Sequence, residues 1–159
     1  MQKMTILCTG KLKEKFYLDA AAEYVKRLSR FCKLEIIELP EERLPEDPSP
    51  AQIEAALSKE ADAVRAKLPN GCLVIAMCVE GRERSSEELA RYLADSAAQG
   101  ASHIVFLIGS SFGMHESLKR QAALRLSMSP MTFPHHLLRV MLLEQIYRAY
   151  QINACLLYT

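Results

Sequence analysis

The sequence predicts an α/β domain, with a mostly parallel sheet and helices on both faces. Strand-like apolar runs alternate with helical segments along almost the whole chain, and this alternation is typical of parallel sheets. The runs at 72–79 and 104–108 are nearly uninterrupted in their apolar character, as expected of strands that are buried on both faces. With 159 residues and 50% hydrophobic content, the chain suits one domain over residues 1–159.

The first half of the chain contains two predicted strands and two predicted helices. Between residues 16 and 31, apolar side chains recur at helical spacing with cationic ones opposite, which indicates an amphipathic helix. Ser49 and Gln52 have the spacing of a capping box, and Pro50 stands at the first helical position. The predicted elements are a strand over 4–9, a helix over 16–31, a strand over 33–39, an exposed proline-containing loop over 41–50 and a helix over 50–68.

The second half begins with a buried strand and ends with a long apolar helix. Ser85 and Glu88 form a second capping box, and Gly100 follows the end of that helix. Apolar residues go most of the way around the last helix, so we expect it in the core or in a subunit contact. The predicted elements are a strand over 72–79, a turn over 80–82, a helix to about 99, a strand over 104–108, a short helix, a short strand over 124–128 and a helix over 135–150.

Ligands of open parallel sheets bind beyond the carboxyl ends of the strands. Here these ends are 80–82, 109–113 and 129–134. The glycine-bracketed loop over 109–113 matches neither a phosphate-binding P-loop nor a dinucleotide fingerprint. The loop that carries Met128, Met131 and Phe133 offers backbone groups for an adenine edge and apolar surface for its faces. The alternative, that these methionines fill the core, is equally compatible with their spacing.

Composition narrows the class of protein. The start of the chain and its short apolar runs predict neither a secretion signal nor a membrane span, so we expect a cytoplasmic protein. Five cysteines are scattered without metal-ligand spacing, which favours buried free thiols and no metal site. The net charge of +1 neither indicates nor forbids a nucleic-acid partner.

Several spaced segments together resemble a known family. They are 106–109 followed by Gly113, 126–135, 139–140 and 144–149, with further matches at 10–15 and 80–82. In these segments, which cover nearly the whole chain, the sequence is similar to the bacterial methyltransferases that modify N3 of a pseudouridine in 23S ribosomal RNA. Those enzymes are minimal members of the SPOUT class.

The resemblance implies a fold and a cofactor. It implies that the C-terminal segment is threaded as a deep trefoil knot, which is an exception to the usual rule against threaded chains, and that the protein is a homodimer. It also implies S-adenosyl-L-methionine bound in the knot, largely through main-chain contacts. The cofactor-binding residues implied by position are Met77, Gly109, Met128, Ser129, Pro130, Met131, Thr132 and Phe133.

The substrate comes from the resemblance as well: a pseudouridine of 23S rRNA in the assembled 70S ribosome. Methyl transfer from a sulfonium requires an aligned nucleophile and an exit for its proton. We hypothesise that Arg139 stabilises negative charge on the base or its phosphate, and that His135 orients substrate or relays the proton. Alternatively, Arg139 forms an ion pair at a subunit interface and His135 caps its helix. Candidates for phosphate contact, or ordinary surface residues, are Lys11, Lys13, Lys15, Arg82 and Arg84.

Two other functions are open at this point. Family members typically end in Tyr-His-Lys, whereas this chain ends Leu-Leu-Tyr-Thr, with only Tyr158 as a match. A catalytically silent module that binds S-adenosylmethionine or ribosomes fits this difference. A flavodoxin-like nucleotide binder fits the alternation of strands and helices but leaves the 128–135 loop without a role.

Overall fold

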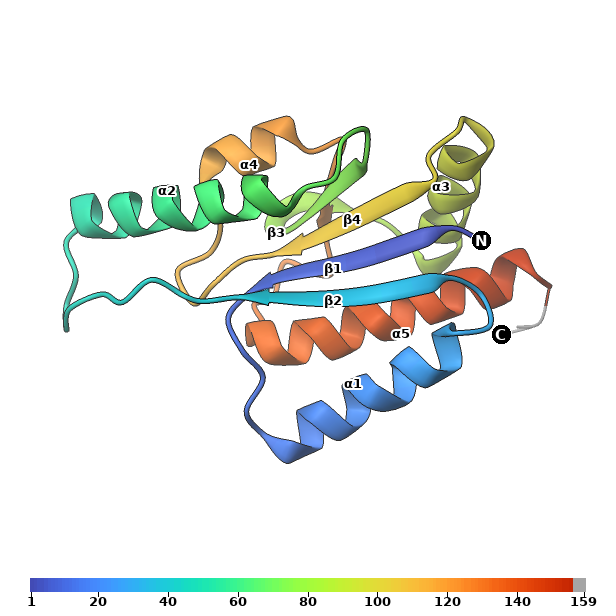
Figure 1. Cartoon of the computed structure of the whole chain (residues 1–159), viewed down its shortest axis with the longest axis horizontal. Coiled ribbons are helices and arrows are strands. Elements are labelled where there is room, and N and C mark those ends of the chain that lie inside the picture. Colours follow the sequence, from blue (N-terminus) through green and yellow to red (C-terminus); the bar gives the residue numbers. More distant parts are fainter. Residues whose placement is uncertain (156–159) are drawn as a thin grey trace.

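The structure, a computed structural model, describes residues 1–155 (Figure 1). Within them, strands and helices alternate as the sequence predicts. The elements are β1 (Lys3–Thr9), α1 (Lys15–Leu28), β2 (Lys33–Leu39), α2 (Pro50–Lys67), β3 (Leu73–Glu83), α3 (Ser86–Ala98), β4 (His103–Ile108), α4 (Glu116–Gln121), β5 (Leu124–Ser127) and α5 (His135–Asn153).

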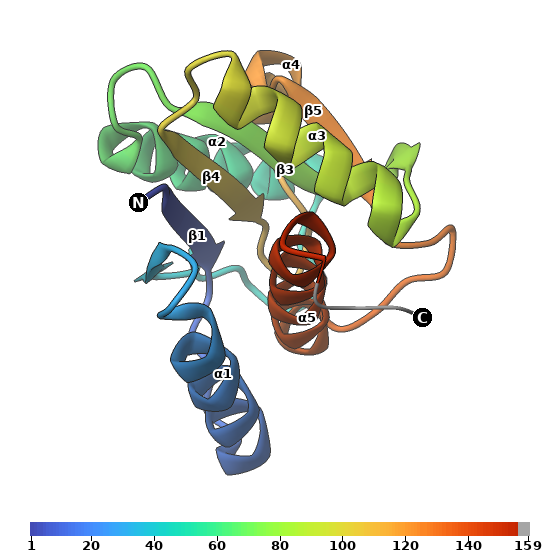
Figure 2. The same cartoon turned by 90° about the vertical axis from the view of Figure 1, so that its right-hand side faces the viewer.

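The five strands form one parallel sheet in the order β2-β1-β4-β3-β5. Alternate residues of the central strands enter two separate apolar clusters. Residues of α1, α3 and α5 pack in one cluster, and residues of α2 and α4 pack in the other. The helices therefore cover both faces of the sheet, which confirms the predicted α/β architecture (Figures 1 and 2).

Helix α5 lies against the sheet between α1 and α3 (Figure 2). Leu142, Leu143 and Ile146 are fully buried, and every residue from 135 to 152 is at least half-buried. A helix that is apolar on most sides needs cover on most sides, so its predicted place in the core is confirmed. The helix begins at His135 and thereby carries that residue to the carboxyl ends of the strands.

The predicted turn over 80–82 is wrong, because β3 continues to Glu83. Its pairing with β5 shifts register: both Met77 and Arg82 pair with Leu126, so the residues between them bulge out of the ladder. Gly81 permits this path, since a Cβ atom there would lie 2.8 Å from the backbone carbon of Arg125. In the sequence, this bulge appears as a glycine that follows an apolar run, and the same pattern is typical of a turn.

Smaller differences concern the first helix and the loop before it. Helix α1 ends at Leu28, whose carbonyl oxygen accepts hydrogen bonds from the N–H groups of Phe31 and Cys32. In the predicted solvated connector, Leu12 is buried and its N–H donates to Glu38 Oε2 at 3.0 Å. The trefoil threading of the C-terminal segment stays a prediction.

We expect Leu142→Ala to lower the free energy of unfolding by about 2–5 kcal/mol, because it opens a cavity between α5 and the sheet. Ser58→Ala, on an exposed position of α2, should change it by less than about 0.5 kcal/mol. Urea denaturation followed by circular dichroism measures both. Equal stability of the two variants would contradict the core position of α5.

Candidate functional site

A cleft of about 360 Å³ opens beyond the carboxyl ends of β3, β4 and β5. This size lies within the range of small-molecule sites. Its walls come from the end of β3, the loop after β4, helix α4, the loop after β5 and the start of α5. Of the predicted cofactor-binding residues, those that line the cleft are Met77, Gly109, Met128, Ser129, Met131, Thr132 and Phe133.

The loop after β4 is a tight turn that closes on itself. The N–H of Ser110 donates to the carbonyl of Gly113 at 3.0 Å, and the N–H of Gly113 donates back at 2.9 Å. A Cβ atom on Gly109 would lie 2.4 Å from the carbonyl oxygen of Gly113. Glycine at 109 is therefore required for close backbone approach, and Ser110 at the next position is accommodated.

Two acidic side chains attach this loop to the rest of the protein. Ser110 Oγ donates to Glu60 Oε1 at 2.8 Å, and the N–H of Ser111 donates to Glu41 Oε1 at 3.0 Å. Glu60 Oε2 also accepts the N–H of Glu42 at 2.9 Å. Burial raises the pKa of Glu60 despite these hydrogen bonds. The segment after β2, predicted as an exposed loop, thus helps to hold the glycine loop in place.

The loop between β5 and α5 is shaped by its serine residues. Ser127 Oγ donates to the carbonyl of Ser129 at 3.0 Å, and Ser129 Oγ accepts the N–H of Met131 at 3.0 Å, a local pattern typical of serine-containing turns. Met131 has 73% of its surface exposed at the cleft. Pro130 is exposed and is not among the lining residues.

His135, the first residue of α5, lines the cleft beside the end of β1. Its Nε2 atom would lie 3.5 Å from a Cβ on Gly10. Burial, followed by the nearby charge of His136, lowers the pKa of His135 below its ordinary value of 6.5. The imidazole is therefore neutral at neutral pH and has a nitrogen lone pair available.

Arg139 lies one turn further along α5 and is not among the lining residues. Its side chain is 3% exposed, and its Nη1 lies 2.6 Å from Glu38 Oε2. Its Nη2 donates to the carbonyl of Gly10 at 3.3 Å. Burial would raise the pKa of Glu38, but the hydrogen bonds from Arg139 and Leu12 outweigh it and lower that pKa. Arg139 is thus an ion-pair partner, but its counter-ion is Glu38 of the same chain and not a residue across a subunit interface.

The opposite side of the cleft carries two charged residues that sequence reasoning did not single out as ligand contacts. Glu80, in the bulge of β3, and Lys119, in α4, both line the cleft and form an ion pair. The hydrogen bond from Lys119 lowers the pKa of Glu80. Within the described part of the chain, they are the only lining residues with full charges. Only the fold could reveal the pair, since 39 positions separate its members.

Among residues 1–155, no helix is long and apolar enough to cross a bilayer, and no group of three or more potential metal ligands comes together. The cysteines are free, as predicted, and Cys8 and Cys32 are buried. Burial raises the pKa of the Cys8 thiol to about 12. Cys155 is exposed, so the expectation of burial is wrong for that residue.

Comparison with known proteins identifies the family. Residues 2–158 match a family model described as "Predicted SPOUT methyltransferase". The chain belongs to the SPOUT methyltransferase family. Two relatives, both named ribosomal RNA large subunit methyltransferase H, are 46% identical (Streptococcus uberis, 95% of each chain) and 45% identical (Bifidobacterium adolescentis, 96% of each chain). A probable methylase family protein from Haemophilus influenzae Rd KW20 shares the fold, with a TM-score of 0.53 and 14% identity over 99% of this chain and 70% of that one.

In this SPOUT protein, we expect a strong energetic coupling between Glu38 and Arg139. Glu38→Gln should lower the free energy of unfolding by about 3 kcal/mol, because it leaves a buried guanidinium without its counter-charge. The double variant Glu38→Gln/Arg139→Met should lose less than the sum of the single losses. Urea denaturation measures this cycle. The exposed pair Lys15–Asp19 is the control, with a coupling below about 1 kcal/mol; equal couplings for the two pairs would contradict the prediction.

Proposed function

We propose that the protein transfers a methyl group from S-adenosyl-L-methionine to N3 of a pseudouridine in 23S rRNA. The observation that carries the proposal is the cleft itself, which is lined by both the glycine loop and the loop before α5. Membership of the SPOUT methyltransferase family supports the reaction type. The names of the relatives support the ribosomal RNA substrate.

The residues of the cleft fit the proposed cofactor. Met77, Met128 and Phe133 supply apolar surface for the faces of an adenine ring. The 127–134 loop brings backbone groups, and few side-chain donors, to the same wall. S-Adenosylmethionine supplies an activated methyl group on a sulfonium. Because the methyl group is already activated, the chain has to bind the reactants, orient them and exclude water from them.

His135 is the side chain best placed to take the proton from the imide nitrogen of the substrate base. It lines the cleft, and its lowered pKa keeps it neutral, so it can accept a proton at physiological pH. Arg139 does not line the cleft but helps to position His135, because it links the start of α5 to Glu38 and to the carbonyl of Gly10. Direct contact of Arg139 with the substrate stays a prediction and would require it to leave Glu38.

The proposed partners are a second copy of the chain and the 70S ribosome, with the cytoplasm as the place of action. Leu137, Val140 and Met141 of α5 remain partly exposed in one chain, which supports a homodimer formed at this helix. Lys11, Lys13 and Arg84 lie in loops near strand ends, whereas Lys15 begins α1 and Arg82 belongs to β3; all five stay candidates for phosphate contacts. The last four residues, with Tyr158, lie outside the described residues, so the predicted effect of the altered tail stays a prediction.

Purified protein should transfer radiolabelled methyl groups to 70S ribosomes that lack the modification. Ribosomes that already carry the modification are the control and should take up no label, because the nitrogen is occupied. Mass spectrometry of the digested 23S rRNA should locate the label on a pseudouridine. Calorimetric binding of S-adenosylmethionine without incorporation would instead establish the silent module.

The rate should depend on the protonation of His135. If the neutral imidazole accepts the proton, the single-turnover rate falls as the pH drops through its lowered pKa, below 6.5, because the protonated form has no free lone pair. His135→Gln should reduce the plateau rate by about 10²–10⁴-fold and remove this acidic limb. His136→Gln is the matched control: it should keep the limb, shifted to higher pH because the charge that helps to lower the pKa of His135 is removed. An unchanged profile in His135→Gln would exclude the assigned role.

A further inference from the structure

The charged pair at one end of the cleft has no role in the proposed chemistry so far. Glu80 and Lys119 both line the cleft, yet the reacting end is assigned to His135. Glu80 follows the central part of β3, whereas His135 lies beside Gly10 at the end of β1. Strand β4 lies between β1 and β3. With a spacing of about 5 Å between strands, the two ends of the cleft are on the order of 10 Å apart.

The pair combines one fixed cation with one fixed anion. Lys119 has a side-chain exposure of 16%, while Glu80 has 54%, so the ammonium lies deeper than the carboxylate. The other lining residues are apolar or uncharged at neutral pH. A ligand that is stabilised by both residues needs a negative group beside Lys119 and an adjacent positive group beside Glu80. A ligand with a single charge would be repelled by one of the two residues and would leave that residue unpaired.

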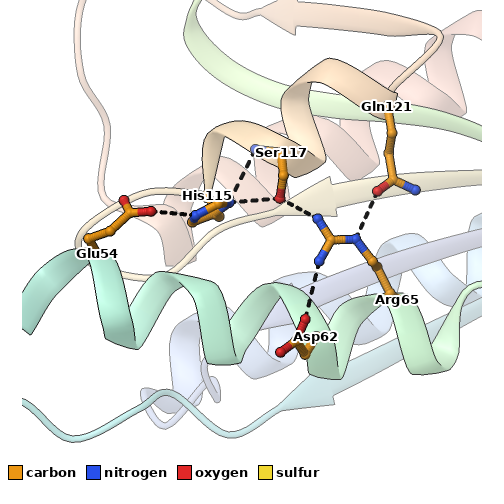
Figure 3. A network of polar contacts seen from close by, with 6 residues as sticks. All are labelled: Glu54, Asp62, Arg65, His115, Ser117 and Gln121. Carbon is orange, nitrogen blue, oxygen red and sulfur yellow. Dashed lines mark hydrogen bonds and ion pairs between the residues drawn. The ribbon is translucent and has the colours of Figure 1, made fainter.

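A polar network joins helix α4, which carries Lys119, to helix α2 (Figure 3). His115 caps α4 by accepting the N–H of Ser117, and its Nε2 lies 2.6 Å from Glu54 Oε1. Arg65 reaches from α2 to Ser117 and to Gln121, the latter at 3.0 Å. These anchors are two residues before and two residues after Lys119. The backbone that carries Lys119 is therefore held in place, and the ion pair with Glu80 positions its ammonium, which reduces the entropy lost on ligand binding.

We propose that Glu80 and Lys119 bind the amino-acid end of the methyl donor. Lys119 binds the α-carboxylate and Glu80 binds the α-ammonium, each by a charge-assisted hydrogen bond. The inference rests on the proposed function, because it assumes that S-adenosylmethionine occupies the cleft. It adds an orientation: the amino-acid end lies between β3 and α4, which leaves the sulfonium free to face His135.

The test separates the amino-acid end of the ligand from the rest. S-Adenosylhomocysteine carries that end, and 5′-methylthioadenosine lacks it while retaining adenine, ribose and sulfur. Isothermal calorimetry with both ligands should show that Lys119→Met weakens binding of S-adenosylhomocysteine by about 10-fold or more. Binding of 5′-methylthioadenosine should change by less than about 2-fold. Glu80→Gln should show the same selectivity.

Two controls make the result specific. Arg120→Met removes a cation from the exposed neighbouring position of α4 and should leave both affinities unchanged. Lys119→Arg retains the charge and should recover part of the lost affinity. Equal losses for both ligands in Lys119→Met, or no loss for either, would overturn the amino-acid subsite while leaving the cofactor in the cleft. If the unaltered protein binds neither ligand, the proposed function itself fails.

Discussion

The cleft depends on the position of β4 between β1 and β3 in a sheet whose strands all run in the same direction. Parallel strands end at one edge, so the segments that follow β3, β4 and β5 must leave the sheet side by side. The loops at 109–113 and 127–134 come together for this reason, although 13 residues separate them in the chain. Helix α5 begins at this same edge, which places its first residue, His135, beside the two loops.

Carboxylates of the first half of the chain hold these segments in place. Glu60 and Glu41 each bind the glycine loop, and Glu38 binds both Leu12 and Arg139. Glu60 and Glu38 accept hydrogen bonds from groups that are buried or partly buried and would otherwise lose their water partners, which is the condition under which buried polar groups stabilise a fold. The β2-to-α2 region therefore has a structural function in the cleft although it contributes no lining residue.

Periodicity and capping predicted most of the fold because they are local. The capping boxes at Ser49 and Ser85 are both present, and the strand over 33–39 has the predicted bounds. The extension of β3 to Glu83 was missed, because it depends on pairing with β5, and Leu12 was missed because its cover comes from distant elements. The same limit applies to the site: the family resemblance predicted seven cofactor-binding residues that line the cleft, and His135 as well, whereas the Glu80–Lys119 pair exists only through the packing of α4 beside β3.

The charges that line the cleft also determine which class of ligand it favours. Glu80 and Lys119 cancel each other, and His135 is neutral at physiological pH, so the described lining has no net charge. A nucleotide or flavin phosphate would find only Lys119 as a cation and would face Glu80 beside it, with a repulsion that costs affinity. S-Adenosylmethionine has no phosphate, and its amino-acid end carries one charge of each sign. The alternative of a flavodoxin-like nucleotide binder is therefore disfavoured by electrostatics as well as by family, because the same pair that suits a zwitterion rejects a polyanion.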